Sequence, residues 1–303
     1  MLNIKPYKRY WRIFNSGYLR IIGIALFIWI VMGIDHQQLI LTIKQAHIPF
    51  LILALFLQLL VYTAKTLRWH TMVRSTGIQP TFLDSWRLYN IGVFLATITP
   101  AKLGEFGKAA YLKKEGLSPV IGIVLVIADR LADVIVISLL SIVGVGILFG
   151  MTWSLIAILL VVLLCLITLL IWSRMSGEYK LLIKMTIFTL MPEKKTISMA
   201  LFYTVLSWIF YFGWAIYIAY SIDITVNIPV LISVFTITGI LSLLPIAPAG
   251  LGTRDAALLT LLASYGVISS QAVALALLMF CSILIMGIPG GLCWIMQGSR
   301  QKG

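Results

Sequence analysis

The chain has 303 residues, of which 61% are hydrophobic and only 11% are charged. Charged residues make up about a quarter of a soluble domain, so this composition excludes a soluble enzyme or a soluble binding module. Lysine and arginine number 23, against 10 aspartates and glutamates. In a membrane protein such an excess indicates orientation in the bilayer rather than nucleic-acid binding. We therefore expect a single integral membrane domain over residues 1–303 and no nucleic-acid partner.

Long apolar segments predict an all-α polytopic membrane protein, because a helix needs about 20 apolar residues to cross the hydrocarbon core. The basic N-terminus, residues 1–17, precedes the first such segment. That segment lacks a small-residue cleavage site and is expected to remain in the protein as a helix. Six spanning helices are predicted, at residues 18–34, 48–69, 118–148, 152–172, 197–220 and 270–295.

Two further apolar segments are too short to cross, and a break rich in proline and glycine follows each of them. Irregular backbone at membrane depth needs protein or a water-filled cavity around it. We therefore expect residues 83–115 and 229–265 to form two re-entrant helical hairpins. Ordinary interfacial loops between amphipathic helices are the alternative. The expected hinges are Pro100, Pro245, Pro248 and Gly250.

The two hairpins match each other in sequence, which predicts an internal repeat. The segment 100–104 aligns with 248–252, an offset of 148 residues that also relates the apolar segments beginning near 48 and 197. Three crossings separate equivalent elements, so the two copies have opposite orientations, as in many secondary transporters. Repeat A covers about residues 48–148, and repeat B covers about residues 197–297.

The basic residues predict which side of the membrane holds the termini. With six crossings and two re-entrant hairpins, 20 lysines and arginines fall on the side of the termini and two on the other. Cytoplasmic loops are enriched in these residues, so both termini are expected in the cytoplasm and the protein in the cytoplasmic membrane. This count assigns Lys65, Arg68 and Lys108 to cytoplasmic segments.

Charged residues inside the membrane are costly, and they therefore mark candidate functional positions. Asp129, Arg130 and Asp133 lie within the third predicted helix at spacings that put them on one face. We expect Arg130 to meet an anion in a cavity, close to Glu105. A self-compensating ion cluster that only fixes helix packing is the alternative.

The hairpin breaks supply the other candidates. In each hairpin a glycine is expected directly before a half-helix, whose N–H groups and positive dipole end favour an anion. The histidines and cysteines show no spacing typical of a metal site, and neither a metal nor a cofactor is expected. The predicted substrate-binding residues are Lys102, Gly104, Glu105, Arg130, Asp133, Gly252, Thr253, Arg254 and Asp255.

Two ordered motifs resemble a known family. The residues Pro100, Gly104 and Glu105, followed by Arg130-x-x-Asp133, are similar to the first signature of the lysylphosphatidylglycerol synthase transmembrane-region family, also called flippase-like or UPF0104 proteins. The stretch 244–255 is similar to its second signature. The resemblance covers about residues 20–297 and implies a multi-pass protein linked to lipid translocation.

These observations together predict a lipid flippase or transporter. The expected cargo is an anionic or aminoacylated phospholipid, or a polyprenyl-phosphate-linked lipid. Two-part members of the family use a separate cytoplasmic domain for aminoacyl transfer, and that domain is not expected here, so no enzymatic activity is expected. One alternative is a membrane-embedded enzyme acting on lipid-linked phosphate or sugar through Asp129 and Asp133. The other is an accessory scaffold whose partner is an envelope-lipid or glycan biosynthesis enzyme.

Overall fold

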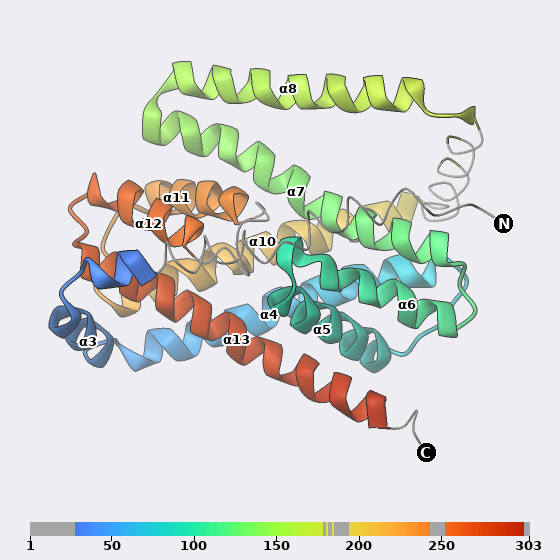
Figure 1. Ribbon diagram of the computed structural model, residues 1–303, viewed down its shortest axis with the longest axis horizontal. Coiled ribbons are helices and arrows are strands. Elements are labelled where there is room, and N and C mark those ends of the chain that lie inside the picture. The colour runs from blue at the N-terminus through green and yellow to red at the C-terminus, as the bar shows by residue number, and fades with distance from the viewer. Residues whose placement is uncertain (1–27, 178–179, 181–183, 185–193, 243–251, 300–303) are drawn as a thin grey trace.

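The computed structural model describes residues 28–177, 180, 184, 194–242 and 252–299, and in these ranges every regular element is a helix (Figure 1). Five of the described helices are long and apolar enough to cross a membrane. They are α4 (Ile48–Arg74), α7 (Pro119–Phe149), α8 (Met151–Arg174), α10 (Lys194–Ser221) and α13 (Ser269–Ser299). The predicted span 18–34 lies mostly outside the described residues.

The predicted spans agree with these helices except at the end of the second. The sequence predicted an end at residue 69, where charged residues interrupt the apolar run, but α4 continues to Arg74. Arg68 and Trp69 are fully buried there. The helix continues because neighbouring helices supply partners for its charges, as described below.

Shorter helices fill the two segments that were expected to be hairpins. The first contains α5 (Phe82–Ile98), the 3-10 helix η1 (Pro100–Phe106) and α6 (Gly107–Lys114), and the second contains α11 (Ile228–Leu241) and α12 (Thr253–Ala263). A further short helix, α3 (His36–Lys44), precedes α4. Gly116 after α6 and Gly266 after α12 both have positive φ, near 89° and 78°. Glycine adopts this backbone conformation without steric strain, so both segments end in the same kind of turn.

The main packing contacts join the first half of the chain to the second. Helix α4 packs along α10, α5 packs against α13, and α7 packs against α11. Glycines allow close approach at two of these contacts. A Cβ at Gly290 of α13 would overlap the backbone carbonyl of Asn90 in α5, and one at Gly239 of α11 would overlap the side chain of Ile137 in α7.

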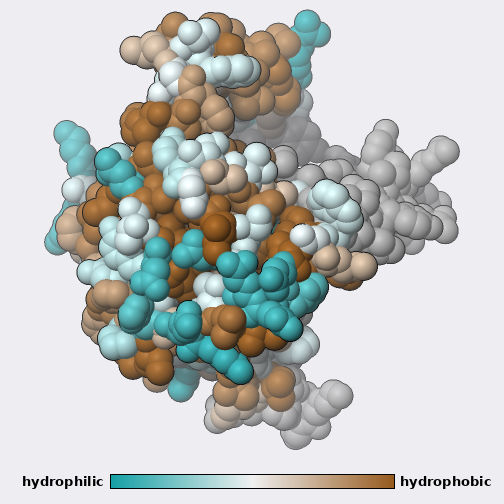
Figure 2. Space-filling model, turned by 90° about the vertical axis from the view of Figure 1, so that its left-hand side faces the viewer, coloured by the Kyte–Doolittle hydropathy of each residue, from teal (hydrophilic) through white to brown (hydrophobic). Residues whose placement is uncertain are grey.

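The two short-helix segments lie at opposite ends of the molecule, with α5 and α6 on the right of Figure 1 and α11 and α12 on the left. Hydrophilic residues gather on the left-hand end, which carries α3 (Figure 2). Helix α8 stands apart and packs chiefly against α7. All of its residues are described, and only Ser154 is buried. A helix that is apolar on all sides is suited to a lipid environment.

Candidate functional site

Charged side chains from four elements form one buried cluster at the end of the molecule that holds α5 and α6. Helix α4 contributes two cations, η1 and α6 contribute a carboxylate and a lysine, and α7 contributes two carboxylates and an arginine. We call this the charge cluster. Its members are Lys65, Arg68, Glu105, Lys108, Asp129, Arg130 and Asp133.

Arg68 is the centre of the charge cluster and is completely buried. Its Nη2 lies 2.7 Å from Oδ1 of Asp129, and its Nη1 lies 2.8 Å from Oδ1 of Asp133. It also donates to the carbonyl oxygen of Asp129 and to the hydroxyl of Thr204 on α10. One guanidinium therefore ties α4 to both α7 and α10. A planar guanidinium with five donors suits this bridging role.

Lys108 connects α6 to the same carboxylates. Its Nζ lies 3.1 Å from Oδ2 of Asp129 and 3.3 Å from Oε2 of Glu105. The ammonium also lies 4.3 Å from the centre of the Trp69 ring and 4.7 Å from that of Tyr89, within the range of cation–π attraction. Gly92 of α5 makes room for this side chain, since a Cβ there would lie only 2.9 Å from its methylene carbons.

Arg130 is the member of the charge cluster with the most exposed side chain, 27%, among those for which an ion pair is described. Its Nη2 pairs with Oε2 of Glu105, whereas the nearest oxygens of Asp129 and Asp133 lie 3.7 and 4.0 Å away. Its Nε has no hydrogen-bond partner among the described residues. The predicted proximity of Arg130 and Glu105 is therefore present, and Asp133 is held mainly by Lys65 and Arg68.

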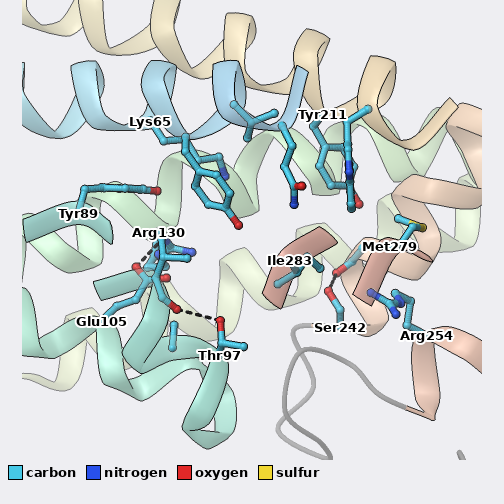
Figure 3. A pocket seen from close by; sticks show the side chains of 17 residues that line it. Lys65, Tyr89, Thr97, Glu105, Arg130, Tyr211, Ser242, Arg254, Met279 and Ile283 are labelled. Atoms are coloured by element: carbon cyan, nitrogen blue, oxygen red, sulfur yellow. Dashed lines mark hydrogen bonds and ion pairs between the residues drawn. The ribbon is translucent and has the colours of Figure 1, made fainter. Parts of the chain in front are cut away.

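A cavity of about 190 Å³ lies between the two halves of the chain. Figure 3 shows Arg130 and Glu105 at one end of it, Arg254 at the other, and Tyr211 and Ile283 between them. A second cavity of about 310 Å³ shares part of this wall, including Lys65 and Arg130. The central cavity is lined by Gln58, Val61, Tyr62, Lys65, Tyr89, Val93, Ala96, Thr97, Glu105, Arg130, Tyr211, Trp214, Gly239, Ser242, Arg254, Met279 and Ile283.

The second hairpin brings Arg254 and Asp255 to the far end of the central cavity. Both are buried, and Nη2 of Arg254 lies 3.0 Å from Oδ1 of Asp255 and donates to the carbonyl oxygen of Ala276 on α13. Gly252 has a φ of 80° and directly precedes α12, as predicted, and Thr253 is the first residue of that helix. The predicted hinges Pro245, Pro248 and Gly250 lie outside the described residues.

The tip of the first hairpin differs from the prediction. Gly104 was expected directly before a half-helix, but it lies inside η1, and α6 begins only at Gly107. The predicted residues Pro100 and Lys102 also belong to η1. Gly104 packs against the α5 backbone at Leu95, which leaves no space for a Cβ and explains the tight η1 turn.

Neither tip glycine presents a free N–H group to the cavity. The N–H of Gly104 donates to Oγ1 of Thr99 at 2.7 Å, and the N–H of Gly252 donates to Oδ2 of Asp255 at 2.9 Å. In this structure the positive charge on the cavity wall therefore comes from the side chains of Lys65, Arg130 and Arg254 rather than from these two backbone groups.

The sequence prediction missed three members of the charge cluster. It assigned Lys65, Arg68 and Lys108 to cytoplasmic segments, but all three pair with the carboxylates on α7, Arg68 and Lys108 as buried side chains and Lys65 as a half-buried one. One signal was available for α4, because the apolar pattern resumes after Arg68 with Trp69, Met72 and Val73. Asp129 and Asp133 are paired with cations of the cluster, whereas Arg130 also lines the cavity.

Comparison with known proteins gives the family. The chain is 30% identical over 121 residues to a UPF0104 membrane protein of Pyrococcus horikoshii, a match that covers 39% of this chain and 36% of that protein. It is 28% identical over 125 residues to a UPF0104 membrane protein of Methanocaldococcus jannaschii, covering 40% and 37%. These matches thus span little more than a third of either relative. The family model described as "Lysylphosphatidylglycerol synthase TM region" matches residues 18–291. Since this match extends over most of the sequence, the protein is a membrane protein that belongs to the lysylphosphatidylglycerol synthase transmembrane-region family.

Proposed function

We propose that this protein is a flippase-like transporter that moves a lipid across the cytoplasmic membrane. The cargo class is an anionic or aminoacylated phospholipid, or a polyprenyl-phosphate-linked lipid. The observation that carries the proposal is the cavity between the two halves of the chain, with Arg130 at one end and Arg254 at the other. Moving a bare ionised group into hydrocarbon costs on the order of tens of kcal/mol. Guanidinium groups that hold a phosphate through paired hydrogen bonds replace much of its lost hydration.

The topology that we propose has six crossings: residues 18–34 form the first, and the five long helices described above form the others. It also has two re-entrant hairpins of opposite orientation and both termini in the cytoplasm. The reciprocal packing supports it, because exchanging the two repeats converts the α5–α13 contact into the α11–α7 contact and leaves α4–α10 unchanged. The placement of α5 and α6 opposite α11 and α12 agrees with hairpins that enter from different faces.

Thiol labelling tests this topology. In a variant whose three cysteines are replaced by serine, Lys302→Cys should react with a membrane-impermeant maleimide only in inside-out vesicles. Lys44→Cys, on the exposed surface of α3, should react only in right-side-out vesicles. The proposed topology has five crossings between α3 and the C-terminus, namely α4, α7, α8, α10 and α13, so these two positions lie on opposite sides. Labelling of both positions from the same side would therefore reject the six-crossing arrangement.

The carboxylates support transport over an enzyme. Asp129 and Asp133 are the candidate catalytic pair, but Asp129 is held by Arg68 and Lys108, and Asp133 is held by Lys65 and Arg68. Carboxylates fixed in this way act as countercharges. A general acid, in contrast, must hold and release a proton near the working pH.

A flipping assay tests the proposed function. Proteoliposomes that contain the purified protein and a trace of fluorescent phosphatidylglycerol are treated with dithionite, which bleaches only the outer leaflet. The protein should add a slow bleaching phase that protein-free vesicles lack, and lipid extracts should contain no new product. Bleaching identical to that of protein-free vesicles would reject the transporter, and a new lipid product would favour the enzyme.

A further inference from the structure

The charge cluster does not balance. Among its described side chains there are four cations, Lys65, Arg68, Lys108 and Arg130, against three carboxylates, Glu105, Asp129 and Asp133. One positive charge therefore remains. The side chains of Arg68 and Lys108 are only 1% exposed, whereas those of Lys65 and Arg130 are 18% and 27% exposed, so the excess charge is accessible where Lys65 and Arg130 line the cavity.

The far end of the central cavity adds no net charge. Arg254 and Asp255 form a buried pair there, and residues 243–251 contain no charged residue in the sequence. The excess charge is thus located at the end that holds Arg130, the guanidinium that lines the cavity.

A second, independent observation concerns Gln58 of α4. This side chain lines the central cavity and is 3% exposed, yet its Oε1 has no hydrogen-bond partner among the described residues. A buried amide that lacks a partner is costly, and it is satisfied when a ligand supplies a hydroxyl or amino group. The amide can present either its oxygen or its nitrogen to such a group.

From these observations we infer that the cavity accepts a singly charged phosphodiester head group that carries a hydroxyl, with the phosphate on Arg130 and the hydroxyl on Gln58. This inference rests on the proposed function and narrows its cargo class. A monoanion neutralises the excess charge of the cluster. A doubly charged phosphomonoester leaves one buried negative charge, and a cationic aminoacyl head group adds to the positive charge that is already present, so both are disfavoured.

Native mass spectrometry from detergent micelles tests the charge part with lipids of matched acyl chains. Phosphatidylglycerol should bind about tenfold more tightly than phosphatidic acid at a pH where the latter is doubly charged, a ratio that corresponds to about 1.4 kcal/mol. Phosphatidylglycerol should also bind at least tenfold more tightly than phosphatidylcholine and lysylphosphatidylglycerol. Equal binding of all four lipids, or a preference for the cationic one, would overturn the inference.

Charge-changing variants make the test sharper. Arg130→Gln, which leaves the cluster neutral, should remove the preference for phosphatidylglycerol over phosphatidylcholine. Glu105→Gln, which leaves two excess positive charges, should shift the preference toward phosphatidic acid. Lys44→Gln removes an exposed charge on α3 and should change nothing. Lys102→Gln measures whether this lysine of η1 contributes, and a loss of preference as large as that of Arg130→Gln would refute the assignment to Arg130.

Phosphatidylmethanol tests the hydroxyl part, because it is a singly charged phosphodiester without a hydroxyl. The protein should bind it more weakly than phosphatidylglycerol, and Gln58→Leu should abolish that difference while leaving phosphatidylmethanol binding unchanged. A difference that persists in Gln58→Leu would disprove the role of Gln58. The flipping assay run on the same lipids separates the two proposals. Selective binding without flipping refutes transport alone, and flipping without selectivity refutes the head-group inference alone.

Discussion

Arg130→Ala should abolish lipid flipping in proteoliposomes while the protein remains folded and inserted. The guanidinium lines the central cavity and pairs closely only with Glu105 among the described residues. After its removal Glu105 keeps Lys108, and Asp129 and Asp133 keep the cations of α4. The cluster then holds three cations and three carboxylates, so the helices stay paired. Loss of a buried charge partner for the phosphate corresponds to about two orders of magnitude or more in rate.

The measurement is the protein-dependent bleaching rate, with size-exclusion profile and melting temperature in detergent as the checks on folding. Lys44→Ala is the matched control, because it removes an exposed cation on α3. A wild-type flipping rate in Arg130→Ala would show that Arg130 serves only helix packing. If Arg130→Ala does not fold, the double variant Glu105→Gln, Arg130→Gln replaces it. This variant removes both charges of the ion pair and should fold but not flip lipid.

The sequence predicted most of the helices because bilayer thickness imposes a length and a composition that are visible locally. Helix α7, predicted at residues 118–148, runs from Pro119 to Phe149. The end of α4 was not predictable in this way. Lys65 and Arg68 resemble the start of a cytoplasmic loop until the carboxylates on α7 are placed beside them. Burial of a charge depends on a partner that is distant in sequence.

The second hairpin shows the same limit. Arg254 was counted with Lys44 on the outer side, because the second hairpin was expected there, and it was also predicted to bind substrate, but its burial beside Asp255 was not predicted. In the structure it is 5% exposed and lines the cavity. Its neighbour Asp255 supplies the countercharge, so the pair enters the interior as a unit. The pairing of Arg130 with Glu105 was predictable, since both residues belong to one motif that the helix order brings together.

Arg68→Met should destabilise the protein far more than any other single change in the charge cluster. Two carboxylates, one backbone carbonyl and the Thr204 hydroxyl all accept from this one side chain. Asp129 is fully buried and would keep only Lys108 among its close described partners. Removing one partner of a buried ion pair costs about 3–5 kcal/mol, which is a large part of the stability of many folded proteins.

The test is unfolding by denaturant in mixed micelles, with Arg74→Met as the control on the same helix. Arg74 is exposed and bonds to Gln79, so its loss should change the free energy of unfolding by less than about 0.5 kcal/mol. Adding Asp129→Asn to Arg68→Met should cost less than the sum of the single changes, because the two residues share one interaction. Additive losses, or equal losses for Arg68→Met and Arg74→Met, would contradict a central role for Arg68. Arg68 occupies the carboxylates of Asp129 and Asp133 and so leaves Arg130 facing the cavity. If Arg68 had no central role, the position of Arg130 at the cavity would need another explanation.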